Sequence, residues 1–191
     1  VQDVIPIQCV WPDGIFKVGI KFSKTYRFTD INYKVASRND KETMFLAYSE
    51  LLNSLDCAAT TKLTICNRRQ SQADFEQSVL MPMQEDGLDK YRREYNQMLM
   101  DKAAGANGIT QEKYVTITVY KRDIEDARAY FARIGADLTA RFAALGSKCV
   151  ELDASERLRI LHDFYRQGEE AEFRFNAREM MKRGHDFRDY I

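Results

Sequence analysis

The segment KYVTITVYK, residues 113–121, constrains the fold of this chain more than any other stretch. β-Branched and aromatic residues alternate along it, which is the pattern of a strand with one buried face. Val115, Ile117 and Val119 form the face that we expect to be buried. A long amphipathic segment follows at once, with Asp123 as its predicted N-cap and Gly146 as its predicted end. The sequence therefore predicts a strand packed beneath a long helix.

Strand and helix patterns continue in a regular order on both sides of this pair. Strands are predicted in a leading hairpin over 1–22, then over 23–31, 61–67, 113–121 and 147–152, and helices over 40–55, 88–103, 123–145 and 153–165. Within the hairpin, Pro12-Asp13-Gly14 is the turn, and the alternation from Phe16 to Phe22 predicts a single strand. Asn39 or Asp40 is the expected cap of the first helix.

The order of these elements predicts the fold class. When residues 68–112 are set aside, the order is β-α-β-β-α-β, the ferredoxin-like or split βαβ pattern. We therefore expect an α+β fold with a mixed, mostly antiparallel sheet and the main helices on one face. Residues 1–166 form this domain, with an inserted helix within 68–112 and an irregular part that includes Pro82.

The last segment, residues 167–191, is predicted to be a helical extension. It has short apolar clusters separated by many charges, so we expect it to pack against a part of a longer polypeptide. The chain begins without Met and stops on Ile191, which leads us to expect an excised piece.

Composition argues against several functions. Lys+Arg and Asp+Glu both count 29, so the formal net charge is zero, whereas non-specific binding to nucleic acid or anionic lipid needs a basic excess. The four cysteines form no CxxC pair and the two histidines have no metal-ligand spacing. No apolar run approaches the roughly 20 residues that span a bilayer. We expect no metal ion and no cofactor in this chain.

The stretch CVELDASERLRILHDFY, residues 149–165, gathers the most reactive side chains. Asp153 and Glu156 have the spacing of a helix capping box, and His162 lies about two turns further on. Cys66, which precedes two arginines, and Cys149 are the candidate nucleophiles, although a structural role explains both more simply. The phosphate-binding run GxxxxGK[ST] is absent. We therefore expect no enzymatic activity from this chain.

Four long runs carry a family resemblance: FTDINYKVASRNDKETMFLAYSELLNSLD, EDGLDKYRREYNQMLMDKA, KYVTITVYK and YFARIGADLTARFAALGSKCVELDASERLRILHDFYR. Together they resemble the N-terminal domain of the conjugal-transfer ATPase of type IV secretion systems. The version that they are most similar to is carried by conjugative transposons and integrative elements of Gram-positive bacteria. The resemblance extends from about residue 15 to the end of the chain.

The resemblance implies a function for the whole protein. Such a protein is a hexamer-forming motor of the RecA-like class, cytoplasmic and peripheral to the membrane. Its ATP and magnesium bind in a C-terminal domain with Walker sequences, which this chain lacks, so no catalytic residue carries over. The N-terminal domain implied by the resemblance docks onto membrane components of the channel and onto neighbouring subunits, and couples motor movement to them.

Two sets of residues are candidates for contact. An exposed apolar patch for docking is expected in the extension, at Phe173, Phe175, Met180 and Met181. The alternative is a contact with single-stranded DNA through Arg68, Arg69, Arg92 and Arg93. Tyr114 and Tyr120 share one strand face and offer rings for base stacking, but the signature of RNA-recognition modules is absent.

Overall fold

The computed structural model of the protein describes residues 5–31, 33–69, 79–105, 109–170, 172–180 and 186–191. The strands are β1 (Cys9–Val10), β2 (Phe16–Val18), β3 (Lys21–Phe28), β4 (Thr60–Arg69), β5 (Ile109–Tyr120) and β6 (Cys149–Glu151). The helices are α1 (Arg38–Asn53), α3 (Asp89–Gly105), α4 (Ile124–Ala144), α5 (Ala154–Tyr165), the short α6 (Ala177–Met180) and the 3-10 helix η2 (Phe187–Tyr190).

Strand β3 is the centre of a six-stranded sheet. One edge of β3 pairs along its whole length with β5, antiparallel, from Lys21 opposite Tyr120 to Phe28 opposite Lys113. The other edge is shared, because β2 pairs with the first residues of β3 and β6 pairs with the last, both antiparallel. Strand β4 follows β5, and β1 follows β2. The α+β class with a mostly antiparallel sheet is thus confirmed, and the order β6-β3-β5-β4 is compatible with the split βαβ pattern.

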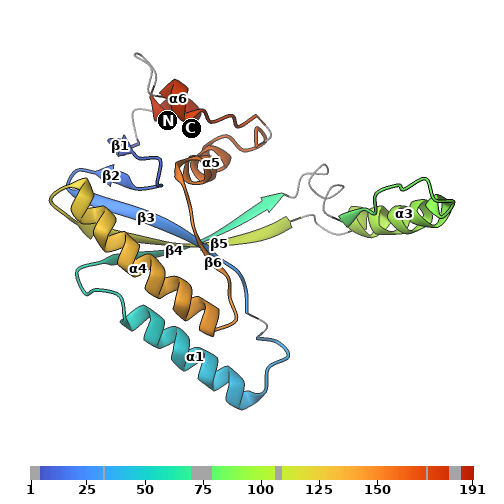
Figure 1. Ribbon diagram of the computed structural model, residues 1–191, viewed down its shortest axis with the longest axis horizontal. Coiled ribbons are helices and arrows are strands. Elements are labelled where there is room, and N and C mark those ends of the chain that lie inside the picture. The colour runs from blue at the N-terminus through green and yellow to red at the C-terminus, as the bar shows by residue number, and fades with distance from the viewer. Residues whose placement is uncertain (1–4, 32, 70–78, 106–108, 171, 181–185) are drawn as a thin grey trace. The chain divides into compact units, whose positions relative to one another are not determined.

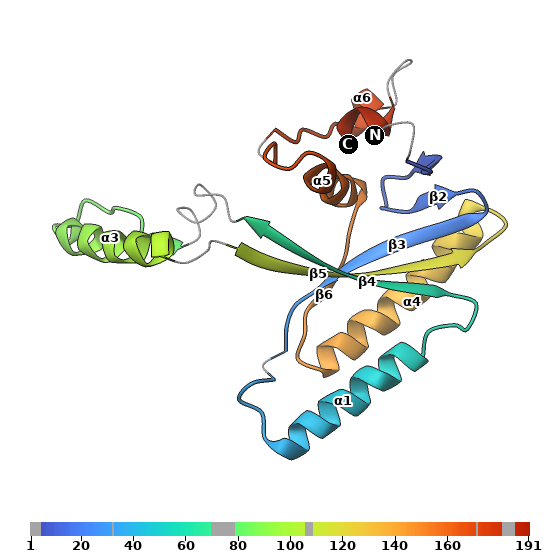
Figure 2. The same ribbon diagram turned by 180° about the vertical axis from the view of Figure 1, so that it is seen from behind.

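The two main helices α1 and α4 lie on one face of this sheet, and α5 lies on the other (Figures 1 and 2). The main core forms between the sheet and α4. Alternate residues of β3, such as Phe22 and Tyr26, point into it, as do Val115, Ile117 and Val119 of β5. Tyr26 is fully buried, and its hydroxyl donates to the backbone oxygen of Phe131 in α4 at 3.3 Å. The predicted buried face of residues 113–121 is therefore confirmed.

The predicted single strand from Phe16 to Phe22 is wrong, because the chain reverses within it. Strand β2 ends at Val18, and β3 begins at Lys21 and returns antiparallel to β2. Gly19 has a φ of 60°, the left-handed conformation that a two-residue hairpin turn with glycine at its first position requires. Phe16 and Phe22 consequently belong to different hydrophobic clusters, and Ile20 is exposed at the turn.

A second hydrophobic cluster lies on the α5 side and includes the end of the chain. It joins the leading hairpin to α5 and to the tail through Ile5, Ile7, Phe16, Leu158, Phe187 and Ile191. The expectation that residues 167–191 pack against something outside this chain is therefore wrong for the described part of that tail. Its apolar side chains need a partner, and β2 and α5 of the same chain supply one.

Arg157 of α5 links this second cluster to the sheet. Its Nη1 donates to the backbone oxygens of Gly14 and Ser23, each at 2.7 Å, and its guanidinium lies 3.8 Å from the centroid of the Phe16 ring. The side chain is buried, and burial lowers its pKa to about 9, so it still carries its charge at neutral pH. One cation therefore holds the hairpin turn, β3 and α5 together.

The chain divides into two compact units. The larger consists of Val1–Thr64 with Lys113–Ile191, and the smaller is Ile65–Glu112, which contains α3. The smaller unit covers almost the same residues as the insertion that the sequence predicts between the two halves of the sheet.

Gly14 and Gly19 provide a matched test of the hairpin. Both have positive φ, but a Cβ on Gly14 would lie 2.1 Å from the backbone oxygen of Leu152, whereas nothing lies within 4 Å of a Cβ on Gly19. We expect Gly14→Ala to lower the free energy of unfolding by about 3 kcal/mol and Gly19→Ala by about 1 kcal/mol, since only the first adds a clash to the strain of positive φ. Urea denaturation measures both, and equal losses would contradict this account.

Arg157 and Arg159 provide a second pair, on one helix. Arg157→Ala removes two bonds to buried backbone oxygens, so we expect it to lower the free energy of unfolding by about 3 kcal/mol or more. Arg159 is half-exposed and lies 4.0 Å from Asp163, so Arg159→Ala is expected to cost less than about 0.5 kcal/mol. Thermal and chemical denaturation measure both variants. A loss below about 1 kcal/mol for Arg157→Ala would show that the buried cation is dispensable.

Candidate docking surface

Helix α1 begins with a capping box. Asp40 donates its backbone N–H to Ser37 Oγ, and its carboxylate accepts from the Ser37 backbone N–H. The cap is thus Ser37, and the prediction of Asn39 or Asp40 as the cap is wrong by two or three positions. Asp40 takes the acidic N3 role, which fixes the first turn.

The inner surface of α1 is narrow. Ala47, Tyr48 and Leu51 pack against the main core, and among the described residues Leu51 is the one side chain of α1 that is fully buried. Burying one leucine contributes about 2 kcal/mol, which is little for a helix of 16 residues. The attachment of α1 to the main core therefore depends on few side chains.

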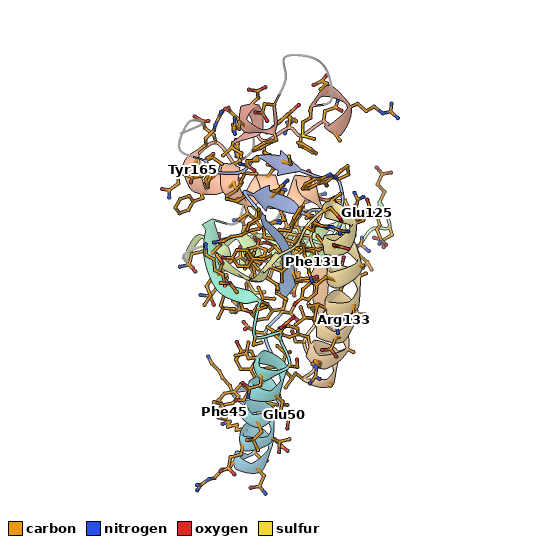
Figure 3. The ribbon with its side chains drawn as sticks, turned by 90° about the vertical axis from the view of Figure 1, so that its left-hand side faces the viewer. Phe45, Glu50, Glu125, Phe131, Arg133 and Tyr165 are labelled. Carbon is orange, nitrogen blue, oxygen red and sulfur yellow. The ribbon has the colours of Figure 1, made fainter. Side chains whose placement is uncertain are left out.

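The outer surface of α1 is apolar without being buried. Phe45 is 66% exposed, Leu46 61% and Leu52 40%. Phe45 and Leu52 are seven residues apart and lie on the same side of the helix, two turns from each other. Figure 3 shows Phe45 at the surface of α1, whereas Phe131 of α4 lies inside against the sheet. We call Phe45, Leu46 and Leu52 the α1 surface.

A groove of about 730 Å³ runs along α4 in the larger unit. Its charged groups are already paired: Lys24 lies 2.5 Å from Glu151, and Arg128 Nε donates to Asp13 at 2.7 Å. Much of the rest of its lining consists of alanines of α4. The charged side chains of the groove are therefore held in ion pairs across its lining.

The residues predicted for docking lie elsewhere. Phe173, Phe175 and Met180 are half-buried and pack against the second cluster, so they do not form the exposed patch that was expected. Phe173 and Phe175 also line a shallow pocket of about 530 Å³ beside the start of α5. Met181 lies outside the described residues.

Among the side chains that the structure describes, the arginines predicted for nucleic-acid contact do not form a basic stripe. Arg92 donates to Asp86 and, at 2.8 Å, to Asp89, so two carboxylates already balance its charge. These hydrogen bonds lower the pKa of Asp86 to about 2. Arg93 is exposed, and Arg68 and Arg69 belong to β4 with side chains outside the described part.

The tyrosines considered for base stacking are in different environments. Tyr114 is buried and Tyr120 is half-exposed, with Lys21 Nζ 5.3 Å from the centroid of its ring. A single stacking platform of both rings is therefore absent from this strand.

Within residues 149–165, Asp153 and Glu156 form the N-terminal cap of α5. Glu156 donates its backbone N–H to Asp153 Oδ1 at 2.8 Å, and Asp153 donates to Glu156 Oε2 at 3.2 Å, which confirms the capping box. His162 is buried with its ring against Phe173 and its Nδ1 3.4 Å from Asp163. The described residues contain no group of three or more His, Cys, Asp or Glu that could hold a metal ion.

Sequence reasoning missed the α1 surface and the role of Arg157. A signal for the first was present, because Phe45 and Leu46 lie outside the apolar stripe of their helix. Arg157 gave no signal, since its acceptors are backbone oxygens up to 143 residues away.

No helix within the described ranges is both long enough and apolar enough to cross a membrane. Comparison of the chain with models of protein families and with curated proteins gives no match.

The cysteines test the geometry around β6. Burial, with a smaller effect of Glu151, raises the pKa of the Cys149 thiol to about 11, whereas Cys57 is exposed. Because the thiolate reacts, we expect a maleimide at pH 8 to modify Cys149 at least about tenfold more slowly than Cys57. Peptide mass spectrometry measures both rates, and the difference should disappear in urea. Similar rates in the folded protein would contradict the burial of Cys149.

Proposed function

We propose that this chain is a non-catalytic docking and coupling domain of a conjugal-transfer type IV secretion ATPase. The observation that carries the proposal is the α1 surface, where three large apolar side chains lie exposed on one helix. Exposed apolar groups in a cluster are typical of a protein contact. The resemblance of the four long sequence runs supplies the identity of the machine.

In this proposal the chain works beside the motor. The parent protein is cytoplasmic and peripheral to the membrane, and its ATP and magnesium bind in a domain other than this one. The α1 surface contacts a membrane component of the channel.

The reading frame itself gives the first test. We expect a GxxxxGK[ST] run within about 200 residues after Ile191, a domain-scale distance. A reading frame that closes directly after Ile191 would contradict the motor proposal.

A substitution on α1 gives the functional test. In the parent protein, Phe45→Asp should reduce the frequency of DNA transfer by at least about tenfold while ATP hydrolysis is unchanged, because a charge in an apolar contact removes binding energy but leaves the motor intact. The matched control is Thr43→Asp, which adds the same charge at another exposed position of α1.

Two outcomes of this assay would contradict the proposal. Normal transfer by Phe45→Asp would exclude the α1 surface as the docking site. Equal losses in both variants would show that the added charge damages α1 itself. Strongly salt-dependent binding of single-stranded DNA, lost in Arg93→Ala, would favour the nucleic-acid alternative instead.

A further inference from the structure

The smaller unit carries an apolar surface of its own. Tyr91, Tyr95 and Met98 lie on one stripe of α3, at spacings of three and four residues, and are 65%, 43% and 43% exposed. Leu88, at the start of the helix, continues the stripe and is also exposed. These four residues, which we call the α3 stripe, form one face of an amphipathic helix of 17 residues, about 26 Å long.

The neighbouring face of α3 is already occupied within the unit. Asn96 is buried; its side chain accepts from the backbone N–H of Met81 and donates to the Met81 oxygen, both at 2.9 Å. Arg92 holds Asp86 in the same way. The segment before α3 is thus fixed along one side of the helix, and the side chains of Met81 and Met83 in that segment are half-exposed.

The opposite edge of the α3 stripe carries charges in an ordered arrangement. Lys90, Glu94, Gln97 and Asp101 follow one another along it, and all four are exposed. Gln97 donates to Asp101 at 2.9 Å, a neutral contact. Within the described part of the chain neither Lys90 nor Asp101 forms an ion pair. A positive charge therefore lies at one end of the row and a negative charge at the other, both without an ion-pair partner there.

We propose that the α3 stripe binds the α3 stripe of a second copy of this chain, with the two helices antiparallel. In an antiparallel pair centred beside Tyr95, Tyr91 meets the second copy's Met98, and the two Tyr95 rings meet at the twofold axis. Lys90 then faces the second copy's Asp101, and Glu94 faces Gln97. The antiparallel arrangement also opposes the two helix dipoles favourably.

The charges favour this occupant over others. A nucleic acid or an anionic membrane would require a basic rim, whereas the charges here are balanced, with Glu94 and Asp101 against Lys90 and Lys102. A parallel pair would place the charged edge against the side that Arg92 and Asn96 occupy, where the carboxylates of Asp86 and Asp89 are already bound to Arg92. The antiparallel pair of like helices gives Lys90 and Asp101 partners of opposite charge and places Glu94 opposite an amide. The inference stands on the smaller unit and does not rest on the proposed function.

The experiment is sedimentation equilibrium of the whole chain over a roughly thousandfold range of concentration. We expect a monomer–dimer equilibrium. Tyr95→Glu should raise the dimer Kd by at least about thirtyfold, because it replaces the central contact with two like charges. Tyr91→Lys is a second disrupting variant, and circular dichroism confirms that both remain folded. Phe45→Glu on α1 is the control and should leave the Kd unchanged, which separates this test from that of the proposed function.

A charge exchange tests the orientation. Lys90→Glu and Asp101→Lys should each raise the Kd by about fivefold to tenfold, because each places two like charges opposite one another at both ends of the pair. The double variant Lys90→Glu/Asp101→Lys should return the Kd to that of the unchanged protein. A monomer at every concentration, a dimer that both tyrosine variants leave intact, or a double variant no better than the singles would each overturn the proposal.

Discussion

The larger unit depends on the buried guanidinium of Arg157. Its described contacts are backbone oxygens, a hydroxyl oxygen and the ring of Phe16. Arg157 reaches from α5 to the turn at Gly14 and to Ser23 in the central strand. A guanidinium presents several N–H groups in one plane, so a single side chain can satisfy acceptors on two segments at once. Desolvation makes this position costly, and the bonds to Gly14 and Ser23 offset that cost only while the turn, the strand and the helix all keep their places.

The contacts of Arg157 explain how the leading hairpin and the tail are attached to the sheet. Gly14 must pass next to Leu152, where a side chain would collide with a backbone oxygen. The same approach places the Gly14 oxygen within reach of Arg157. Phe16 then covers the flat side of the guanidinium and brings β2 into the second cluster, against which the tail packs. A single contact network thus unites the two ends of the described chain with the centre of the sheet.

Much of this fold follows from local patterns in the sequence. The alternation of residues 113–121, the cap at Asp123 and the capping box of Asp153 and Glu156 depend on neighbours a few residues away, and all three are confirmed. The turn at Gly19 was missed because the apolar alternation continues through it and hides the reversal. The tail was misjudged because a short apolar cluster does not reveal which surface buries it.

The candidate surfaces were predictable to a smaller degree. The α3 stripe was visible as helical periodicity, yet its exposure depends on what the rest of the chain covers. The exposure of the α1 surface could not be predicted from the sequence, because it depends on how few side chains of α1 pack against the main core. Arg92 shows the opposite error. The sequence suggests a free cation that could bind nucleic acid, but in the structure Arg92 is paired with Asp86 and Asp89.

The central position of β3 has a consequence for how the chain folds during synthesis. Strand β3 is made before β5 and β6, so one of its edges waits for β5, and the end of the other waits for Glu151, which pairs with Tyr26. Ribosomes add on the order of 10 residues per second, so β3 stays unpaired along most of its length for roughly ten seconds. A strand with free edges can pair with another chain during such an interval, and the cations Lys21, Lys24 and Arg27 of β3 oppose this only in part. Early pairing with β2 covers part of one edge, and the leading hairpin therefore also protects the nascent chain.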